Sequence, residues 1–423
     1  MLWRNNGNGL GAIVESIIIK CCGLETNISV RAVGSTYLIQ LSDDDVPDID
    51  VNELHKRALK GKGIQKAAKS LKIELTPRLL GAYERWSKHY GALTPLLLYS
   101  KLTDIYINNR IMVRHSDYGL VEVNIEVSEQ DINYLLKRIS SRCRTPITSY
   151  QPMISVADEE YGIRVSVTMP PVGGPAIHIR IMPRKPWTLP CLVNNGMITA
   201  RDAAILWQLF EDKVPLLIVG PIGSGKTSLA NAIAFMGNPS LFMALIMDVD
   251  EMNLPNHLVY KLMERKSFGL GVKSISKDDL ITQALRMGVD YIIVNEVITG
   301  VEAKAWLNAV TSGHGGITTF HAGNAIDAAK RFSIIAPDIG GILKRIAIIE
   351  TNIIDVVDES GGVSVNRRLR VVKSVIHDHD LDAGKIDVKT EIIRGLVGYD
   401  ANSIIGTVKN YYSNPTELMR DAK

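Results

Sequence analysis

Short apolar runs alternate with amphipathic segments through the second half of the chain. The apolar runs lie at residues 215–219, 242–248, 291–294 and 316–320. The segments between them have the periodicity of helices, at residues 200–210, 227–235, 277–286 and 302–311. Strands that are apolar on both faces and alternate with helices predict a parallel sheet covered on both sides. A β-like pattern returns near residues 346–354 and 368–376, and the tail beyond residue 392 has a helical pattern.

The pattern between residues 76 and 182 is mixed and predicts an α+β domain. Helices are expected at residues 78–90 and 128–142, the second with Glu129 and Asp131 in its first turn. Strands are expected at residues 104–109, at 111–113 after an Asn-Asn turn, at 164–168 and at 176–181.

Residues 1–75 carry a weaker pattern and are treated as a variable N-terminal region. An amphipathic helix or strand is expected at residues 10–22, and a strand pair at residues 30–41, interrupted by Gly34-Ser35. Residues 56–72 are basic and largely helical in pattern. That segment is either a solvated helix face or a contact for acidic headgroups or an acidic partner.

A proline-rich segment separates the two halves. Residues 183–190 contain three prolines in eight positions. Proline is disfavoured inside helices and central strands, so we expect an extended linker and the main domain boundary here. The second domain then covers residues 191–423 and includes the helical tail.

Composition narrows the class of protein. A chain of 423 residues suggests two or three domains, and a net charge of +3 is too small for wrapping nucleic acid, so direct nucleic-acid binding is not expected. The four cysteines lack C-x-x-C spacing, which argues against a zinc site or a disulfide scaffold and fits a reduced cytosolic location. The longest apolar stretches fall short of 18 uninterrupted residues, so any membrane role is expected to be peripheral.

The strongest chemical signal is a phosphate-binding loop. The pattern G-x-x-x-x-G-K-[ST] lies between an apolar strand and a helix, where this loop requires it. Its residues are Gly220, Pro221, Ile222, Gly223, Ser224, Gly225, Lys226 and Thr227, followed by Ser228. Glycine turns direct backbone N–H groups at phosphate oxygens. Lys226 is expected to reach the β- and γ-phosphates of ATP, and Thr227 to bind Mg²⁺.

A second candidate site follows the apolar strand at residues 291–294. Glu296 stands at its tip, roughly 70 residues after the phosphate loop, which is the Walker B arrangement. A carboxylate there can orient water or bind the metal.

These residues make the chain resemble the secretion-superfamily ATPases, which include type II and type IV secretion, type IV pilus and archaeal pilus or archaellum motors. The resemblance covers roughly residues 98–375. Asp248 and Glu251 match the family's aspartate box, where they would support metal and water, but Met247 replaces its leading glutamate. In the Walker B segment, Asn295 replaces a glycine and Ile298 replaces an arginine. Met247 and Ile298 predict reduced turnover.

The resemblance also covers histidines and arginines. His314 and His321 match the family's histidine box, and the resemblance implies that His321 orients the γ-phosphate side. Arg164 and Arg180 match family arginines that reach nucleotide at a domain or subunit boundary. The four-cysteine zinc insert of many bacterial motors is missing from the sequence, which favours the archaeal-type branch.

The resemblance implies a RecA-like ATPase domain joined to the N-terminal α+β domain, and a homo-hexamer with ATP between the two domains. The implied partners are a polytopic inner-membrane platform protein and filament or secretion machinery, at the cytoplasmic face of the cell membrane. Two alternatives stay open: a DNA-transfer motor, and a nucleotide-gated structural subunit that hydrolyses ATP weakly.

Overall fold

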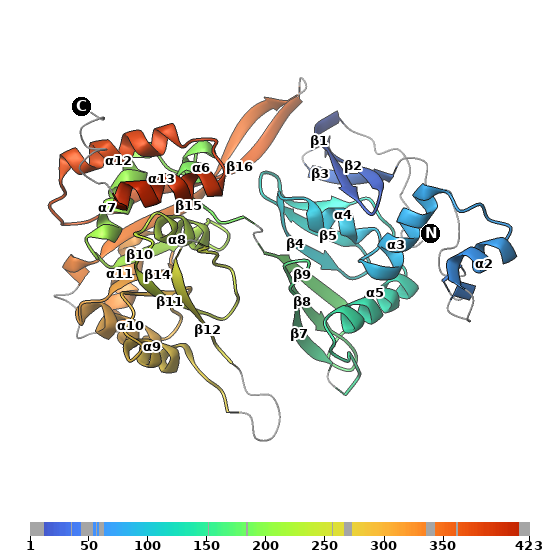
Figure 1. The fold of residues 1–423 in the computed structure, drawn as a ribbon, viewed down its shortest axis with the longest axis horizontal. Helices are drawn as coiled ribbons and strands as arrows, with labels where there is room; N and C mark the ends of the chain where they lie inside the picture. Colours follow the sequence, from blue (N-terminus) through green and yellow to red (C-terminus); the bar gives the residue numbers. More distant parts are fainter. Residues whose placement is uncertain are drawn as a thin grey trace. The chain divides into compact units, whose positions relative to one another are not determined.

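The structure is a computed structural model, drawn in Figure 1. It describes residues 12–34, 36–43, 54–55, 57–58, 63–150, 152–182, 185–255, 257–265, 273–335, 343–360 and 363–413. The chain divides into two compact units. The first contains the residues up to Met182 together with Asp355–Arg368, and the second contains Pro183–Ile354 and Leu369–Lys423.

Nine described strands of the first unit form one sheet in the order β1-β2-β3-β6-β5-β4-β9-β8-β7. They are β1 (Ala12–Cys21), β2 (Leu24–Val33), β3 (Thr36–Asp43), β4 (Leu102–Ile107), β5 (Ile111–His115), β6 (Gly119–Val123), β7 (Met153–Asp158), β8 (Ile163–Thr168) and β9 (Ala176–Ile181). The strand pair expected at residues 30–41 is β2 and β3, and the expected hairpin across Asn108-Asn109 is β4 and β5. Of the expected break at Gly34-Ser35, Gly34 lies in a turn and Ser35 is outside the described residues.

The boundary expected at residue 75 does not separate the first strands from the sheet. β3 pairs in parallel with β6, where Leu38 is opposite Glu122 and Ile39 is opposite Val123. Residues 12–43 therefore extend the sheet of the α+β domain. The sequence could not show this because a parallel pair between distant segments leaves no local pattern.

The helices of the first unit are α2 (Gly63–Ser70), α3 (Pro77–Lys88), α4 (Leu93–Leu98) and α5 (Glu129–Arg142). α5 begins at a capping box, in which the Ser128 hydroxyl accepts the Asp131 N–H and the Asp131 carboxylate accepts the Ser128 N–H. This arrangement satisfies two N–H groups that the first turn leaves unpaired. The basic segment expected at residues 56–72 is helical at α2, and part of it lies outside the described residues.

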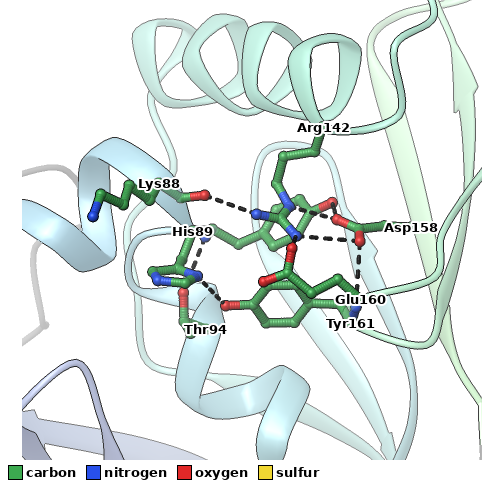
Figure 2. Close-up of polar contacts among 8 residues, drawn as sticks. Lys88, His89, Thr94, Arg142, Asp158, Glu160 and Tyr161 are labelled. Atoms are coloured by element: carbon green, nitrogen blue, oxygen red, sulfur yellow. Dashed lines mark hydrogen bonds and ion pairs between the residues drawn. The ribbon is translucent and has the colours of Figure 1, made fainter.

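A buried ion pair joins the end of α5 to the end of β7 (Figure 2). Arg142 Nε lies 2.5 Å from Asp158 Oδ2, and its guanidinium also contacts Glu160 at 2.9 Å and the carbonyl of Lys88 at 2.9 Å. The hydroxyl of Tyr90 donates to the same Asp158 oxygen at 2.7 Å. One guanidinium therefore ties α3, α5 and β7 together.

Seven described strands form the second sheet, in the order β12-β11-β13-β14-β10-β15-β16. They are β10 (Leu216–Gly220), β11 (Phe242–Met247), β12 (Leu258–Met263), β13 (Tyr291–Val294), β14 (Gly315–His321), β15 (Ala347–Ser360) and β16 (Val363–Ile376). All of them belong to the second unit except residues 355–368 of β15 and β16, which are grouped with the first. β12, β11, β13, β14, β10 and β15 pair in parallel, so their carboxyl ends share one edge.

Helices cover both faces of this sheet (Figure 1). Leu216 and Ile218 of β10 pack into one core, with α6 (Leu189–Asn194), α7 (Ala200–Glu211), α8 (Lys226–Phe235), α12 (Ala383–Gly395) and α13 (Ala401–Ser413). Leu217 and Val219 pack into the other, with α9 (Lys277–Leu285), α10 (Gly300–Thr311) and α11 (Ala325–Ile335). The fully apolar run of β10 follows from this double burial.

The expected linker is shorter than the proline pattern indicates. Residues 183 and 184 lie outside the described residues, and α6 begins at Leu189 with Thr188 as its N-cap. Pro190 stands in the first turn, where its missing N–H costs no intrahelical hydrogen bond. The extended segment therefore ends at Thr188.

The carboxyl-terminal helices are held to α7 and α8 by buried polar contacts. Lys389 of α12 is fully buried and contacts Glu211 at 2.8 Å, Gln208 at 2.6 Å and Tyr411 at 2.9 Å. The Tyr412 hydroxyl of α13 donates to the carbonyl of Met236, which caps the carboxyl end of α8. Among the residues that the structure describes, none of the helices combines the length and apolar character needed to cross a bilayer.

Candidate functional site

The phosphate loop joins the end of β10 to the start of α8. Gly223 and Gly225 adopt positive φ angles of +79° and +89°, and Gly225 is the N-cap of α8. A Cβ at Gly220 would lie 2.4 Å from the backbone oxygen of Thr351 in β15, so only glycine fits there. The loop therefore has the backbone that directs N–H groups inward at the positive end of a helix.

Lys226 is buried at the base of this loop. Its ammonium donates to the carbonyls of Gly220 at 3.0 Å and Pro221 at 2.9 Å, and lies 3.1 Å from His321 Nδ1. Burial lowers the pKa of Lys226 to about 8, against a smaller opposing effect from Glu296. The ammonium form still predominates at neutral pH.

His321 connects Lys226 to Glu296. It ends β14, directly opposite Gly220 in the strand register, and its Nε2 lies 2.9 Å from Glu296 Oε1. Because an ammonium can only donate, His321 Nδ1 is the acceptor. Nε2 then carries the hydrogen that Glu296 accepts, which fixes a neutral imidazole in one tautomer. A cation, a neutral imidazole and a carboxylate therefore stand in one hydrogen-bonded line.

Thr227 follows Lys226 in the first turn of α8. Its hydroxyl donates to Asn295 Oδ1 at 3.1 Å, at the residue that follows β13. The phosphate-loop amides, Lys226 and the oxygens of Thr227 and Glu296 are the donor set that a magnesium–nucleotide complex requires. The residues present thus fit that ligand. Ser228 lies one position further along α8, and the Ile222 side chain in the loop is largely exposed.

The aspartate-box residues follow β11 at the same edge of the sheet. Ile246 of β11 pairs with Val294 of β13, so Asp248 and Glu296 stand two positions beyond partnered residues. The side chain of Asp248 is exposed and that of Glu251 is partly buried. Met247 is fully buried in the core beneath α8, so a glutamate there would be surrounded by apolar side chains.

His314, which was expected in the nucleotide site, does not lie beside Lys226, His321 and Glu296 in this chain. It precedes β14, whereas His321 ends it. A parallel strand rises roughly 3.3 Å per residue, so the two histidines stand about 20 Å apart at opposite edges of the sheet. His314 Nδ1 instead lies 3.2 Å from the carbonyl of Ala309 in α10.

Arg164 and Arg180 lie in the first unit, opposite each other on β8 and β9. Arg164 Nε donates to Ser155 Oγ at 3.0 Å, and Arg180 Nε lies 3.3 Å from Asp104 Oδ1. Asp104 also accepts from His178 at 2.9 Å.

The sequence patterns did not indicate two residues that support the site, Thr351 and Arg331. The Thr351 hydroxyl donates to Val219 O at 3.0 Å and lies 2.7 Å from Ser224 Oγ, so β15 buttresses the loop. Arg331 of α11 donates to the carbonyl of His321 at 2.6 Å and covers the Phe320 ring. Neither belongs to a local motif, and only the spacing of Arg331 on a helix after the histidine strand could have pointed to it.

A family model described as type II/IV secretion system protein matches residues 128–369, which is more than half of the chain. The chain belongs to this family. The resemblance inferred from the sequence motifs is thereby confirmed. So is the expected fold class, a RecA-like P-loop domain with an N-terminal α+β domain.

Individual relatives agree with this family. An uncharacterized protein of Methanocaldococcus jannaschii is 30% identical over 241 residues, which cover 54% of this chain and 33% of that protein. The conjugal transfer protein TrbB of Rhizobium radiobacter is 25% identical over 283 residues, 65% of this chain and 83% of TrbB. The chain spans about half or less of the length of the Methanocaldococcus proteins that it matches.

A solved structure shares the fold. The X-ray structure of the Yersinia pseudotuberculosis ATPase DotB superposes with a TM-score of 0.50 at 16% identity, over 78% of this chain and 85% of that one. At this level of identity the likeness establishes a common architecture alone.

Proposed function

We propose that this chain is the Mg²⁺-dependent ATPase subunit of a motor for pilus-like filament assembly or for type II or type IV protein secretion. The observation that carries the proposal is the line Lys226–His321–Glu296, with contacts of 3.1 and 2.9 Å, beside a loop with the backbone of a phosphate site. Family membership supports the same reaction, hydrolysis of ATP to ADP and phosphate.

Each residue then has a defined task. The amides of the loop and Lys226 bind the phosphates, and Thr227 and Glu296 hold Mg²⁺, which neutralises charge on the phosphate oxygens when bound. Glu296 accepts a proton from, or orients, the attacking water. His321 holds Glu296 and Lys226 in position through contacts at its two ring nitrogens. Asp248 and Glu251 support the metal and water from the end of β11. Most of the rate comes from positioning and charge.

The assembly and location are proposals as well. We infer a homo-hexamer in which Arg164 and Arg180 contact nucleotide at a boundary between domains or subunits. Its partners are a polytopic inner-membrane platform protein and the filament or secreted substrate. The work is done at the cytoplasmic face of the cell membrane, where domain closure around ATP and its reversal move the partner. The archaeal-type branch remains part of this proposal.

DNA transfer is the second candidate, because the similarity to TrbB, whose name assigns it to conjugal transfer, covers 83% of that protein. A weakly hydrolysing subunit is a third. Met247 is buried where the family pattern has a glutamate, and Ile298 is exposed where that pattern has an arginine. An exposed isoleucine supplies no charge to the transition state.

The test is steady-state phosphate release by the full chain with Mg²⁺ and ATP. We expect turnover on the order of 1 s⁻¹, lost in Lys226→Ala and reduced on the order of a hundredfold in Glu296→Gln. Lys409→Ala is the matched control, since Lys409 is exposed on α13, outside the proposed site. If the wild type bound nucleotide but turned over no faster than Lys226→Ala, the chain would be a nucleotide-gated structural subunit and not a motor. Co-purification with a filament subunit and platform protein, or with a DNA-transfer channel, separates the two motors.

A further inference from the structure

The hydroxyl of Thr227 has a defined orientation. A threonine hydroxyl carries one hydrogen, and here it points to Asn295 Oδ1 at 3.1 Å. Near the start of a helix, such a hydroxyl often donates to a backbone carbonyl one turn earlier. Thr227 instead donates across to the neighbouring strand, so the lone pairs of its oxygen are directed away from Asn295.

Asn295 is itself fixed in place. Its backbone N–H donates to the carbonyl of Ile246 at 2.9 Å, and its backbone oxygen accepts the hydroxyl of Thr319. The residue is 7% exposed. Its backbone is therefore held by both strands that flank β13, and its buried side chain contacts Thr227.

We propose that Asn295 is a positioning residue that sets how tightly the site holds Mg²⁺ with a nucleotide. This inference rests on the proposed function, in which Thr227 binds the metal through its oxygen. Asn295 accepts the one hydrogen of that hydroxyl and leaves the oxygen lone pairs for the cation. Outer-shell hydrogen bonds of this kind orient a ligand and raise its affinity for the metal.

The identity of the side chain determines the effect. The glycine that the family pattern has at this position offers no side-chain acceptor, and the Thr227 hydroxyl would then rotate freely. An aspartate would accept the same hydrogen bond and add negative charge beside the cation. The amide of Asn295 lies between these cases, because it orients Thr227 without adding charge.

The test measures binding of a fluorescent ATP analogue to the full chain, once with MgCl₂ and once with EDTA. The readout is the ratio of the two dissociation constants, which reports the metal alone. We expect Asn295→Gly to reduce the gain from Mg²⁺ by about tenfold or more, with the EDTA constant unchanged. Asn295→Asp should keep the gain at or above that of the wild type. Asn238→Gly, which removes an asparagine from a surface turn of the same unit, is the control.

The outcomes separate the two proposals. The role of Asn295 would be overturned if Asn295→Gly left the ratio of dissociation constants unchanged. It would also be overturned if the variant lost affinity equally with and without Mg²⁺. In both cases the proposed nucleotide site would stand. A ratio reduced equally in Asn295→Asp would overturn the role of Asn295 as well. Failure of the wild-type chain to bind the analogue under either condition would overturn the proposed function, and this inference with it.

Discussion

Thr351 Oγ1 lies 2.7 Å from Ser224 Oγ, although 127 positions separate the two residues in the chain. Ser224 also reaches the carbonyl of Pro221 at 2.9 Å, and Thr351 that of Val219 at 3.0 Å. The two hydroxyls therefore contact each other and two backbone carbonyls, one in the phosphate loop and one in β10. The shape of the loop depends on β15 as well as on its own glycines.

Replacing Thr351 with valine should loosen the loop without changing the volume of the side chain. We expect the free energy of unfolding to fall by about 1–2 kcal/mol, because a buried hydroxyl and a carbonyl lose their partner. The dissociation constant for nucleotide should rise about threefold to tenfold. Urea unfolding and fluorescent-nucleotide titration measure the two effects. Thr282→Val on the surface of α9 is the control, and equal effects in both variants would contradict the buttress.

Nucleotide affinity should fall as the pH rises through about 8. Burial lowers the pKa of Lys226 to about 8, so the free protein loses the ammonium above that pH and must take up a proton to bind phosphate. We expect up to a tenfold loss of affinity per pH unit between 8 and 10. Lys226→Arg should bind less tightly at pH 7 but with a flatter profile, because arginine keeps its charge. Parallel profiles for the two proteins would contradict this.

The same shift affects folding. An unfolded Lys226 holds its proton up to its ordinary pKa near 10.4, whereas the folded residue releases it near 8. The unfolded chain therefore binds more protons between these values, and stability rises with pH across this window. Relative to Lys226→Met, the wild type should gain stability between pH 8 and 10, as measured by urea unfolding. If the difference in the free energy of unfolding between the wild type and Lys226→Met stayed constant from pH 8 to 10, the lowered pKa of Lys226 would be refuted.

Lys389 should be the most sensitive position in the carboxyl-terminal helices. Lys389→Ala leaves the carboxylate of Glu211 without its cation and opens a cavity beside Trp207. We expect a loss of about 3–5 kcal/mol in the free energy of unfolding. The double variant Lys389→Met with Glu211→Gln should recover part of it. Lys409→Ala, on the exposed side of α13, should change stability by less than about 0.5 kcal/mol.

Acid should remove the contribution of the ion pair in Figure 2. Burial raises the pKa of Asp158, but hydrogen bonds from Arg142 and Tyr90 outweigh burial and hold this pKa below its ordinary value. The stabilisation is therefore present above about pH 4 and is lost as the pH falls through the folded pKa. Asp158→Asn should be about 2–4 kcal/mol less stable at pH 7, and the difference should narrow toward pH 3. Unfolding curves at both pH values test this.

Sequence reasoning succeeded where chemistry and structure are contiguous. The phosphate loop needs an apolar strand, a glycine turn and a helix in succession, and Leu216–Gly220 and Lys226–Phe235 supply the two elements on either side of it. The start of α5 was equally clear, because Glu129 and Asp131 are acidic residues in its first turn. Glu296 lies two positions beyond its strand, so its place at the sheet edge follows from the parallel order.

Contacts between distant segments were not accessible in this way. Thr351 reads as an ordinary strand residue, and only the pairing of β15 with β10 brings it to the loop. His314 matched the same motif as His321, but the strand expected between them, now β14, places the two histidines at its opposite ends. The neighbouring glycines have a packing role. A Cβ at Gly315 would lie 2.1 Å from the Tyr291 ring, and one at Gly316 would lie 2.3 Å from Val310.

The hydrogen bond from Tyr412 to Met236 joins α13 to the end of α8 that lies farther from the phosphate loop. The ten residues of α8 span roughly 15 Å, from Lys226 of the phosphate loop to the C-cap Met236, whose carbonyl accepts the Tyr412 hydroxyl. A displacement of α8 that carries Met236 with it would therefore either move α13 as well or break the hydrogen bond from Tyr412.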